Sequence, residues 1–330
     1  VNRDYYNMKG EGAPIGPAIA NGEWISSPSQ ISGMYTFGIT EANEPVIDMY
    51  TFSGTITAAN GATFPLAGIN KSYYYMEPNY QHSHVNAIYM YTHAWGQIDR
   101  GNDGATTPTE VLVVDGVVQN ISIKQSLPLI PPENGYILRA DNIASKFILE
   151  NIQIGDPIQV EYALHPVDPN NTVDPSQLKM LIGGHTILVD KGQPTKFSRD
   201  VSSLNGYRAR TGIGYSQDKR YVYLVTVDHS GDSQGMNLKE FQQFLTMIGV
   251  WKGINLDGGG STQMVVRPLG ETLAQLANKP EYGSERLVVN GVGVYTLAPP
   301  GKEIKGFSIS GPSVVFKREQ AEFSVKAYDE

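Results

Sequence analysis

Short runs in which apolar and polar residues alternate occupy most of this 330-residue chain, and they constrain its fold more than any other feature. The run at 45–70 breaks at Ala-Asn-Gly, and the run at 109–123 breaks at Asp115-Gly116, which is a two-residue hairpin signal. Further runs lie at 34–40, 86–96 and 155–164. Alternation with period two is typical of strands that bury one face. The sequence therefore predicts a chain built mainly from short paired strands.

Two segments have the periodicity of a helix instead. The shorter one covers 142–152, and the clearer one covers 236–250. In the second segment Asn237 is followed three residues later by Glu240, as in a capping box. Two strands are expected within 210–229, before this helix, and an apolar strand directly after it, which is the order of a crossover unit. The predicted fold class is α+β, with strand-rich mixed sheets and few helices.

Composition excludes several classes of function. The net charge of -8 disfavours nucleic acid or anionic lipid as a general partner, because both require a basic surface. The absence of cysteine excludes disulfide scaffolds and thiol catalysis, and it favours a bacterial surface protein over a secreted animal protein. No uncharged apolar run reaches about 18 residues, so no transmembrane segment is predicted. We expect a secreted or cell-surface location, and a piece of a longer polypeptide because the chain starts at Val1 without methionine.

The stretch INLDGGGSTQMVV (254–266) is the strongest candidate for a site. An apolar run ends at Asp257, and three glycines follow although glycine is the most entropically costly residue to fix in a turn. Uncovered backbone N–H groups in such a turn can surround an anion. An ordinary tight turn with an incidental aspartate is the alternative. We therefore predict that Asp257 is catalytic and that substrate is bound by Gly258, Gly259, Gly260 and Ser261.

Arginines elsewhere could bind the same anion. Arg210 precedes a strand that opens with small residues, and guanidinium groups bind phosphate through two hydrogen bonds. Arg286 and Asn290 have the same potential, while a solvated surface position is the alternative for each. Near the start of the chain, Asn2 and Asp4 alternate with tyrosines, a pattern that suits sugar hydroxyls and rings but also an ordinary edge strand.

The spacing of two histidines is a weaker indication of a site, in this case for a metal ion. His82 and His84 would share one face of a strand, yet no carboxylate with ligand spacing accompanies them, so the metal assignment stays unknown. No cofactor is required, and a structural divalent cation stays open.

Four further residues are predicted to line a substrate pocket. His185 and His229 each follow a turn residue, Gly184 and Asp228 respectively, and Asp228 is a second candidate for the catalytic carboxylate. A Ser-His-Asp triad is the alternative, although the chain contains no G-x-S-x-G motif of the nucleophile-elbow type.

The order and spacing of several segments resemble the phosphodiester glycosidase family, which includes the lysosomal uncovering enzyme and bacterial relatives that are often surface proteins. These segments are NRDYYN, GAPIGPAIANGEW, IGGHTILVDKG, RARTGIGYSQDKRYVYLVTVD, SQGMNLKEFQQFLTMIGVWKGINLDGGGSTQMVV and SERLVVNGVGVY. His185 and His229 depart from the family pattern, which commonly has small or polar residues at the first position and glycine at the second. The family also has sequence before the first segment, so a complementing N-terminal segment of the same polypeptide is an expected partner.

The resemblance implies a domain organisation. Residues 1–297 would form an N-terminally incomplete phosphodiester glycosidase-like catalytic domain. The Pro- and Gly-rich residues 298–305 would form a linker. Residues 306–330 would begin an immunoglobulin-like β domain.

The resemblance also implies a substrate, a carbohydrate or glycan phosphate in which a sugar 1-phosphodiester is cleaved at its glycosidic bond. Arg210, Arg286 and the glycine amides would bind the phosphate, and Asp257 or Asp228 would activate water. The N-terminal Asn and Asp would hold sugar hydroxyls. Three alternatives stay open: an ordinary glycoside hydrolase, a teichoic-acid-type phosphodiesterase that cleaves the P–O bond, and a non-catalytic carbohydrate-binding surface module.

Overall fold

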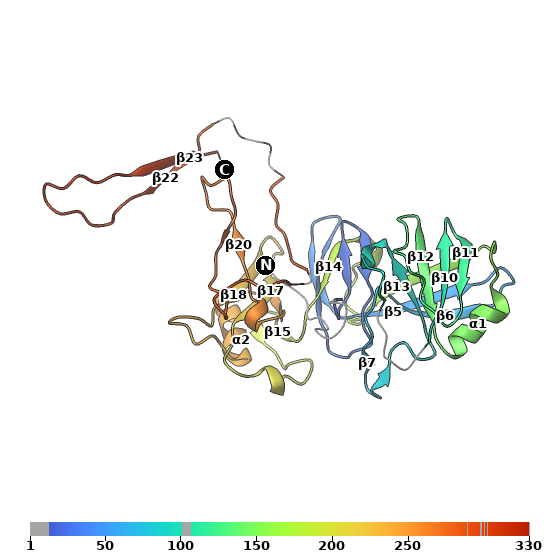
Figure 1. Cartoon of the computed structure of the whole chain (residues 1–330). Helices are drawn as coiled ribbons and strands as arrows, with labels where there is room; N and C mark the ends of the chain where they lie inside the picture. The colour runs from blue at the N-terminus through green and yellow to red at the C-terminus, as the bar shows by residue number, and fades with distance from the viewer. Residues whose placement is uncertain are drawn as a thin grey trace.

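Three sheets carry most of the chain in the computed structural model, which describes residues 13–100, 107–288, 290–297, 299, 301 and 303–329. The middle sheet has the strand order β2-β1-β14-β3-β4. Its strands are β1 (Ala18–Ala20), β2 (Glu23–Ser26), β3 (Thr36–Thr40), β4 (Pro45–Asp48) and β14 (Leu178–Gly183). In Figure 1 this sheet lies between the other two.

The second sheet has seven strands in the order β11-β10-β12-β9-β6-β5-β13. They are β5 (Tyr50–Thr57), β6 (Thr63–Ile69), β9 (Ile88–Thr92), β10 (Thr109–Val114), β11 (Val117–Ser122), β12 (Gly135–Ala140) and β13 (Gln159–Pro166). The two edges meet, because Val118 N–H donates to Asp156 O at 3.0 Å and Ile158 N–H donates to Gly116 O at 2.9 Å. The sheet therefore curls into an incomplete barrel.

Helix α1 (Ile143–Asn151) follows β12 directly and packs Ala144 and Ile148 into the apolar interior of this barrel. The helix is the one predicted at 142–152. The predicted hairpin at Asp115-Gly116 is also confirmed: both residues have positive φ, 52° and 75°, as a two-residue turn between β10 and β11 requires.

The third sheet has the order β16-β15-β19-β17-β18 and positions the candidate site. Its strands are β15 (Ile187–Asp190), β16 (Gln193–Pro194), β17 (Arg210–Tyr215), β18 (Val222–Val227) and β19 (Lys252–Asn255). Helix α2 (Leu238–Met247) connects β18 to β19, and both strands pair antiparallel with β17 between them. The predicted crossover is thus confirmed, as is the capping box of Asn237 and Glu240.

Apolar side chains join the three sheets. Phe37, Ile47 and Ile182 of the middle sheet pack against Ile213 and Ile254 of the third sheet. The other face of the middle sheet packs against the second sheet through a cluster of buried residues. This cluster comprises Ile19, Val46, Tyr50, Leu164, Leu178 and Leu181. The middle sheet is therefore buried on both faces, and the strand-rich α+β fold class is confirmed.

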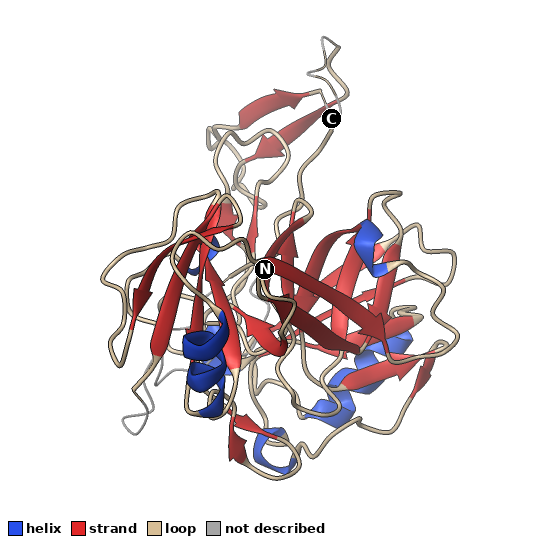
Figure 2. Ribbon diagram, turned by 90° about the vertical axis from the view of Figure 1, so that its right-hand side faces the viewer, coloured by secondary structure: helices blue, strands red, loops and turns tan. Residues whose placement is uncertain are grey.

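Short elements complete the chain. Figure 2 shows that the helices lie at the periphery, beside the strands of the sheets. The remaining strands are β7 (Tyr75–Met76), β8 (Gln81–His82), β20 (Val265–Val266), β21 (Gln275–Leu276), β22 (Gly306–Ser310) and β23 (Ser324–Tyr328). The 3-10 helices are η1 (His93–Trp95), η2 (Pro175–Gln177), η3 (Ser202–Leu204) and η4 (Gly259–Ser261). Strands β22 and β23 form a hairpin that projects from the three sheets in Figure 1. The described part of the chain contains no helix with the length and hydropathy of a membrane span.

Candidate active site

The turn after β19 lies against the beginning of β17. Leu256 N–H donates to Thr211 O at 2.9 Å, and Gly259 N–H donates to Ala209 O at 2.8 Å. A Cβ on Gly258 would lie 2.8 Å from the Ala209 carbonyl oxygen. The glycine at 258 is therefore required for close backbone approach, and the group approached is the Ala209 carbonyl of the protein itself, directly before β17.

The N–H groups of the first two glycines, which were predicted to bind an anion, have acceptors within the protein. Gly258 N–H donates to Asp257 Oδ1 at 3.0 Å, and the Gly259 N–H is used by Ala209. Both donors already have acceptors because Ala209, directly before β17, and the aspartate side chain lie alongside the turn. Gly260 serves a different purpose: a Cβ there would lie 2.5 Å from the ring of Tyr282, so only glycine lets this ring cover the turn.

Asp257, Ser261 and Arg286 form a connected polar group. Arg286 Nη2 donates to Ser261 Oγ and lies 3.9 Å from Asp257 Oδ2, while the Ser261 hydroxyl also hydrogen-bonds to the Asp257 carboxylate. Burial raises the pKa of Asp257 above its ordinary value, and the hydrogen bonds from Ser261 and Gly258 and the Arg286 charge oppose this shift. The site thus holds a carboxylate of increased proton affinity beside a guanidinium.

A second group of polar residues faces the same turn from the segment directly after β18 and from the loop before Arg286. His229 Nδ1 lies 2.9 Å from Glu281 Oε1, and a Cβ on Gly259 would be 3.0 Å from Glu281 Oε2. Asp228 Oδ2 accepts from Lys279 N–H at 3.0 Å. Among the described residues, Asp228 Oδ1 and Glu281 Oε2 are buried without a hydrogen-bond partner. Two acceptors are therefore available for donors of a ligand.

Arg210 is placed differently from the expectation that it would face a phosphate. Its side chain is buried and donates to the carbonyl oxygens of Met236 (2.8 Å), Leu204 (2.7 Å) and Gly206. The guanidinium therefore ties the loop before β17 to the segment before α2, and it acts as a positioning residue. Sequence reasoning could not anticipate this, because the carbonyl acceptors come from two loops.

Gly184 and His185 lie beside β19 on its other flank. A Cβ on Gly184 would lie 2.6 Å from Ile254 Cδ1, and His185 N–H donates to Asn255 O at 2.8 Å. Burial, with a smaller contribution from Arg199, lowers the pKa of His185 to about 4. His185 is therefore neutral at pH 7.

A sequence model of the phosphodiester glycosidase family matches residues 94–295, which is more than half of the chain. The chain belongs to the phosphodiester glycosidase family.

Curated relatives agree with this membership. N-acetylglucosamine-1-phosphodiester alpha-N-acetylglucosaminidase from Bos taurus is 33% identical over 92 residues, covering 26% of this chain and 17% of the bovine protein. The Homo sapiens enzyme is 34% identical over 95 residues, covering 26% and 18%. The matched parts thus span less than a fifth of these relatives.

Two solved structures share the fold. A hypothetical protein from Synechocystis has a TM-score of 0.64 at 17% identity, covering 87% of this chain and 49% of that chain. A protein from Burkholderia pseudomallei, described as a candidate exported protein, has a TM-score of 0.66 at 17% identity, covering 85% and 62%.

The remaining predicted residues lie after Arg286, before β9 or outside the described part of the chain. Asn290 is half-buried in the segment after Arg286. Asn2 and Asp4 lie outside the described residues. Both ring nitrogens of His84 are occupied, by Ser83 Oγ at 2.8 Å and Tyr91 Oη at 2.9 Å. Within the described residues, no group of three or more His, Asp or Glu side chains has the arrangement of a metal site.

Sequence reasoning missed Glu281 and Tyr282. Tyr282 is 76% exposed, although its ring lies directly over the glycine turn. Both residues belong to a loop without hydrophobic periodicity, so no pattern marked them. The one available signal was the acidic and aromatic pair that precedes Arg286 by a few residues.

Proposed function

We propose that this chain hydrolyses the glycosidic bond of a sugar 1-phosphodiester, with Asp257 as the carboxylate that activates water. The observation that carries the proposal is the contact of Arg286 with Asp257 at the glycine turn, where a partly buried carboxylate lies 3.9 Å from a guanidinium. Arginine pairs well with phosphate, and a carboxylate of raised pKa is a better general base near neutral pH. The names of the curated relatives make an N-acetylglucosamine 1-phosphodiester the first substrate to test.

In this mechanism Arg286 binds the phosphodiester and Asp257 faces the anomeric carbon. Water attacks that carbon, its proton passes to Asp257, and the electron pair of the anomeric C–O bond leaves with the phosphate oxygen. The products are a free sugar and a phosphomonoester. Because a phosphate is a leaving group of low pKa, the reaction needs less help from a general acid than hydrolysis of an ordinary glycoside does.

The sugar would lie against the exposed Tyr282 ring. Asp228 Oδ1 and Glu281 Oε2 are buried acceptors that suit sugar hydroxyls, and His229 holds Glu281 in place at 2.9 Å. Buried acceptors without partners are costly, so hydroxyl donors from a substrate would offset that cost. Tyr282 offers an apolar face, which complements the C–H face of a sugar ring.

Hydrolysis in ¹⁸O-labelled water tests which bond is cleaved. Attack at the anomeric carbon puts the label in the released sugar, and this is the expected result. Label in the phosphomonoester would mean P–O cleavage and would overturn the proposal in favour of a phosphodiesterase. An absence of turnover, together with binding of the diester, would instead support a non-catalytic carbohydrate-binding module.

We also propose a location and a domain organisation for this family member. A secreted or cell-surface location is supported by the fold shared with the candidate exported protein from Burkholderia pseudomallei. A catalytic domain up to residue 297, a linker at 298–305 and an immunoglobulin-like module from 306 are supported by the hairpin β22–β23, which projects from the three sheets. Limited proteolysis that released the part after 305 while leaving hydrolysis intact would support this division.

A further inference from the structure

The incomplete barrel of the second sheet has an open end that the proposed reaction does not use. Helix α1 follows the last residue of β12, whereas Tyr136 lies at the beginning of this strand, so the helix and Tyr136 occupy opposite ends of the barrel. A cavity of about 460 Å³ opens at the Tyr136 end. This volume lies within the range of about 300–1,000 Å³ that is usual for small-molecule sites, and barrel mouths are a common place for them.

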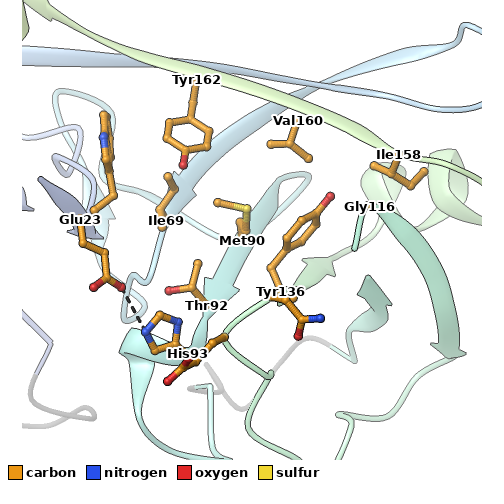
Figure 3. Close-up of a pocket in the computed structure, with 14 residues that line it drawn as sticks. Glu23, Ile69, Met90, Thr92, His93, Gly116, Tyr136, Ile158, Val160 and Tyr162 are labelled. Carbon is orange, nitrogen blue, oxygen red and sulfur yellow. Dashed lines mark ion pairs between the residues drawn. The ribbon is translucent and has the colours of Figure 1, made fainter. Parts of the chain in front are cut away.

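Strand alternation decides which side chains reach this cavity. Thr92 pairs with Tyr136, and Met90 pairs with Leu138, so these positions share the inner face of β9 and β12. On β13, Val160 and Tyr162 also line the cavity. Figure 3 shows Tyr162 above Met90 and Tyr136 beside it, with the ion pair of Glu23 and His93 at one end. Thr92 and Tyr136 are the inward positions closest to the open end.

The walls combine aromatic faces with polar groups. Trp24 packs edge-on against Tyr162 with ring centroids 4.9 Å apart, which fixes the orientation of a tyrosine that is 39% exposed. At the rim His93 Nε2 and Glu23 Oε1 are 3.1 Å apart. Thr92 Oγ1 accepts from Asn70 Nδ2 at 2.8 Å, which leaves the Thr92 O–H to donate to a ligand. Rigid aromatic faces beside hydrogen-bonding groups match the two kinds of surface of a sugar ring.

This cavity differs from the Asp257 site in the charge of its lining residues. Its described lining includes Glu23 and Glu133 but neither lysine nor arginine. A phosphate would be repelled by two carboxylates without a compensating guanidinium. The residues come from the middle and second sheets, whereas Asp257 follows a strand of the third sheet.

We propose that this barrel mouth binds an uncharged sugar unit of a glycan, with Tyr136, Tyr162 and Trp24 contacting the ring and Glu23 and Thr92 binding hydroxyls. The site would hold a glycan chain independently of the phosphodiester bond that is cleaved elsewhere. It does not depend on the proposed hydrolysis, because binding can be measured on an inactive chain.

Titration calorimetry of the whole chain with maltose, cellobiose and chitobiose tests the proposal, with glucose 1-phosphate and decanoate as charged and apolar comparisons. We expect saturable binding of at least one neutral disaccharide. Tyr162→Ala should weaken it about tenfold. Glu23→Gln, which keeps the size and shape of a rim side chain, should weaken it severalfold. Tyr221→Ala removes a tyrosine that is 61% exposed directly before β18 of the third sheet and should leave binding unchanged.

Three results would overturn the proposal. One is the absence of saturable binding of any neutral disaccharide by the unaltered chain. Another is equal binding by the Tyr162→Ala, Glu23→Gln and Tyr221→Ala variants, which would place the sugar elsewhere. The third is displacement of the disaccharide by decanoate, or binding of glucose 1-phosphate that Tyr162→Ala abolishes.

Discussion

Replacing Asp257 by asparagine should lower the rate of hydrolysis while leaving the free energy of unfolding nearly unchanged. The side chain accepts the Gly258 N–H at Oδ1, and an asparagine oxygen can accept the same hydrogen bond. The pairing with Arg286 is long, at 3.9 Å, and the arginine side chain is 34% exposed, so its loss should change the free energy of unfolding by about 1 kcal/mol or less. A general base typically contributes about 10²–10⁴ in rate, or about 2.7–5.4 kcal/mol of activation free energy.

We therefore expect the Asp257→Asn variant to unfold at nearly the same denaturant concentration as the unaltered chain while its kcat on an N-acetylglucosamine 1-phosphodiester falls at least about 100-fold. Release of the phosphomonoester measures kcat, and urea unfolding followed by fluorescence measures stability. Asp218→Asn is the matched control, because Asp218 lies in the turn between β17 and β18, at the other end of the sheet. If Asp257→Asn kept near-normal turnover with unchanged stability, the assignment of Asp257 as the base would be wrong.

Two further predictions concern the surroundings of Asp257. The pKa of His185 is about 4 in the folded chain and its ordinary value is 6.5, so below pH 6.5 the unfolded chain binds a proton that the folded chain does not, and stability falls as pH drops toward 4. Between pH 7 and 4.5 the unaltered chain should lose about 2–3 kcal/mol more than His185→Gln in urea unfolding, and equal losses would contradict the reasoning. Gly258→Ala should cost about 1–3 kcal/mol and also lower kcat, because its Cβ would meet the Ala209 oxygen at 2.8 Å. Gly206→Ala, where a Cβ meets nothing within 4 Å, is the control, and similar stability and kcat of the two variants would refute the proposed steric clash.

The periodic segments of the fold were predictable because their physics is local. The helix at 236–250 was marked by its apolar face and by the Asn237–Glu240 capping box, which depend on residues within one turn of each other. The hairpin at Asp115-Gly116 was marked by the residues that tolerate positive φ. The crossover followed from the order of strand, helix and strand. Closure of the second sheet into a barrel was not predictable, because it depends on hydrogen bonds between two distant edges.

The candidate site shows the same division. By itself, the sequence determined that Asp257 closely follows a strand, which ends at Asn255, and that the following glycines allow a close backbone approach. Only the tertiary structure decided what is approached. The Ala209 carbonyl, directly before β17, accepts from the Gly259 amide, and Arg210 donates to carbonyl groups. Glu281 reaches the turn from a loop whose sequence has no hydrophobic periodicity. The reason is physical, since a residue's backbone propensity is set by its own neighbours, whereas the partners of a side chain are set by which distant segments the packing of the sheets brings together.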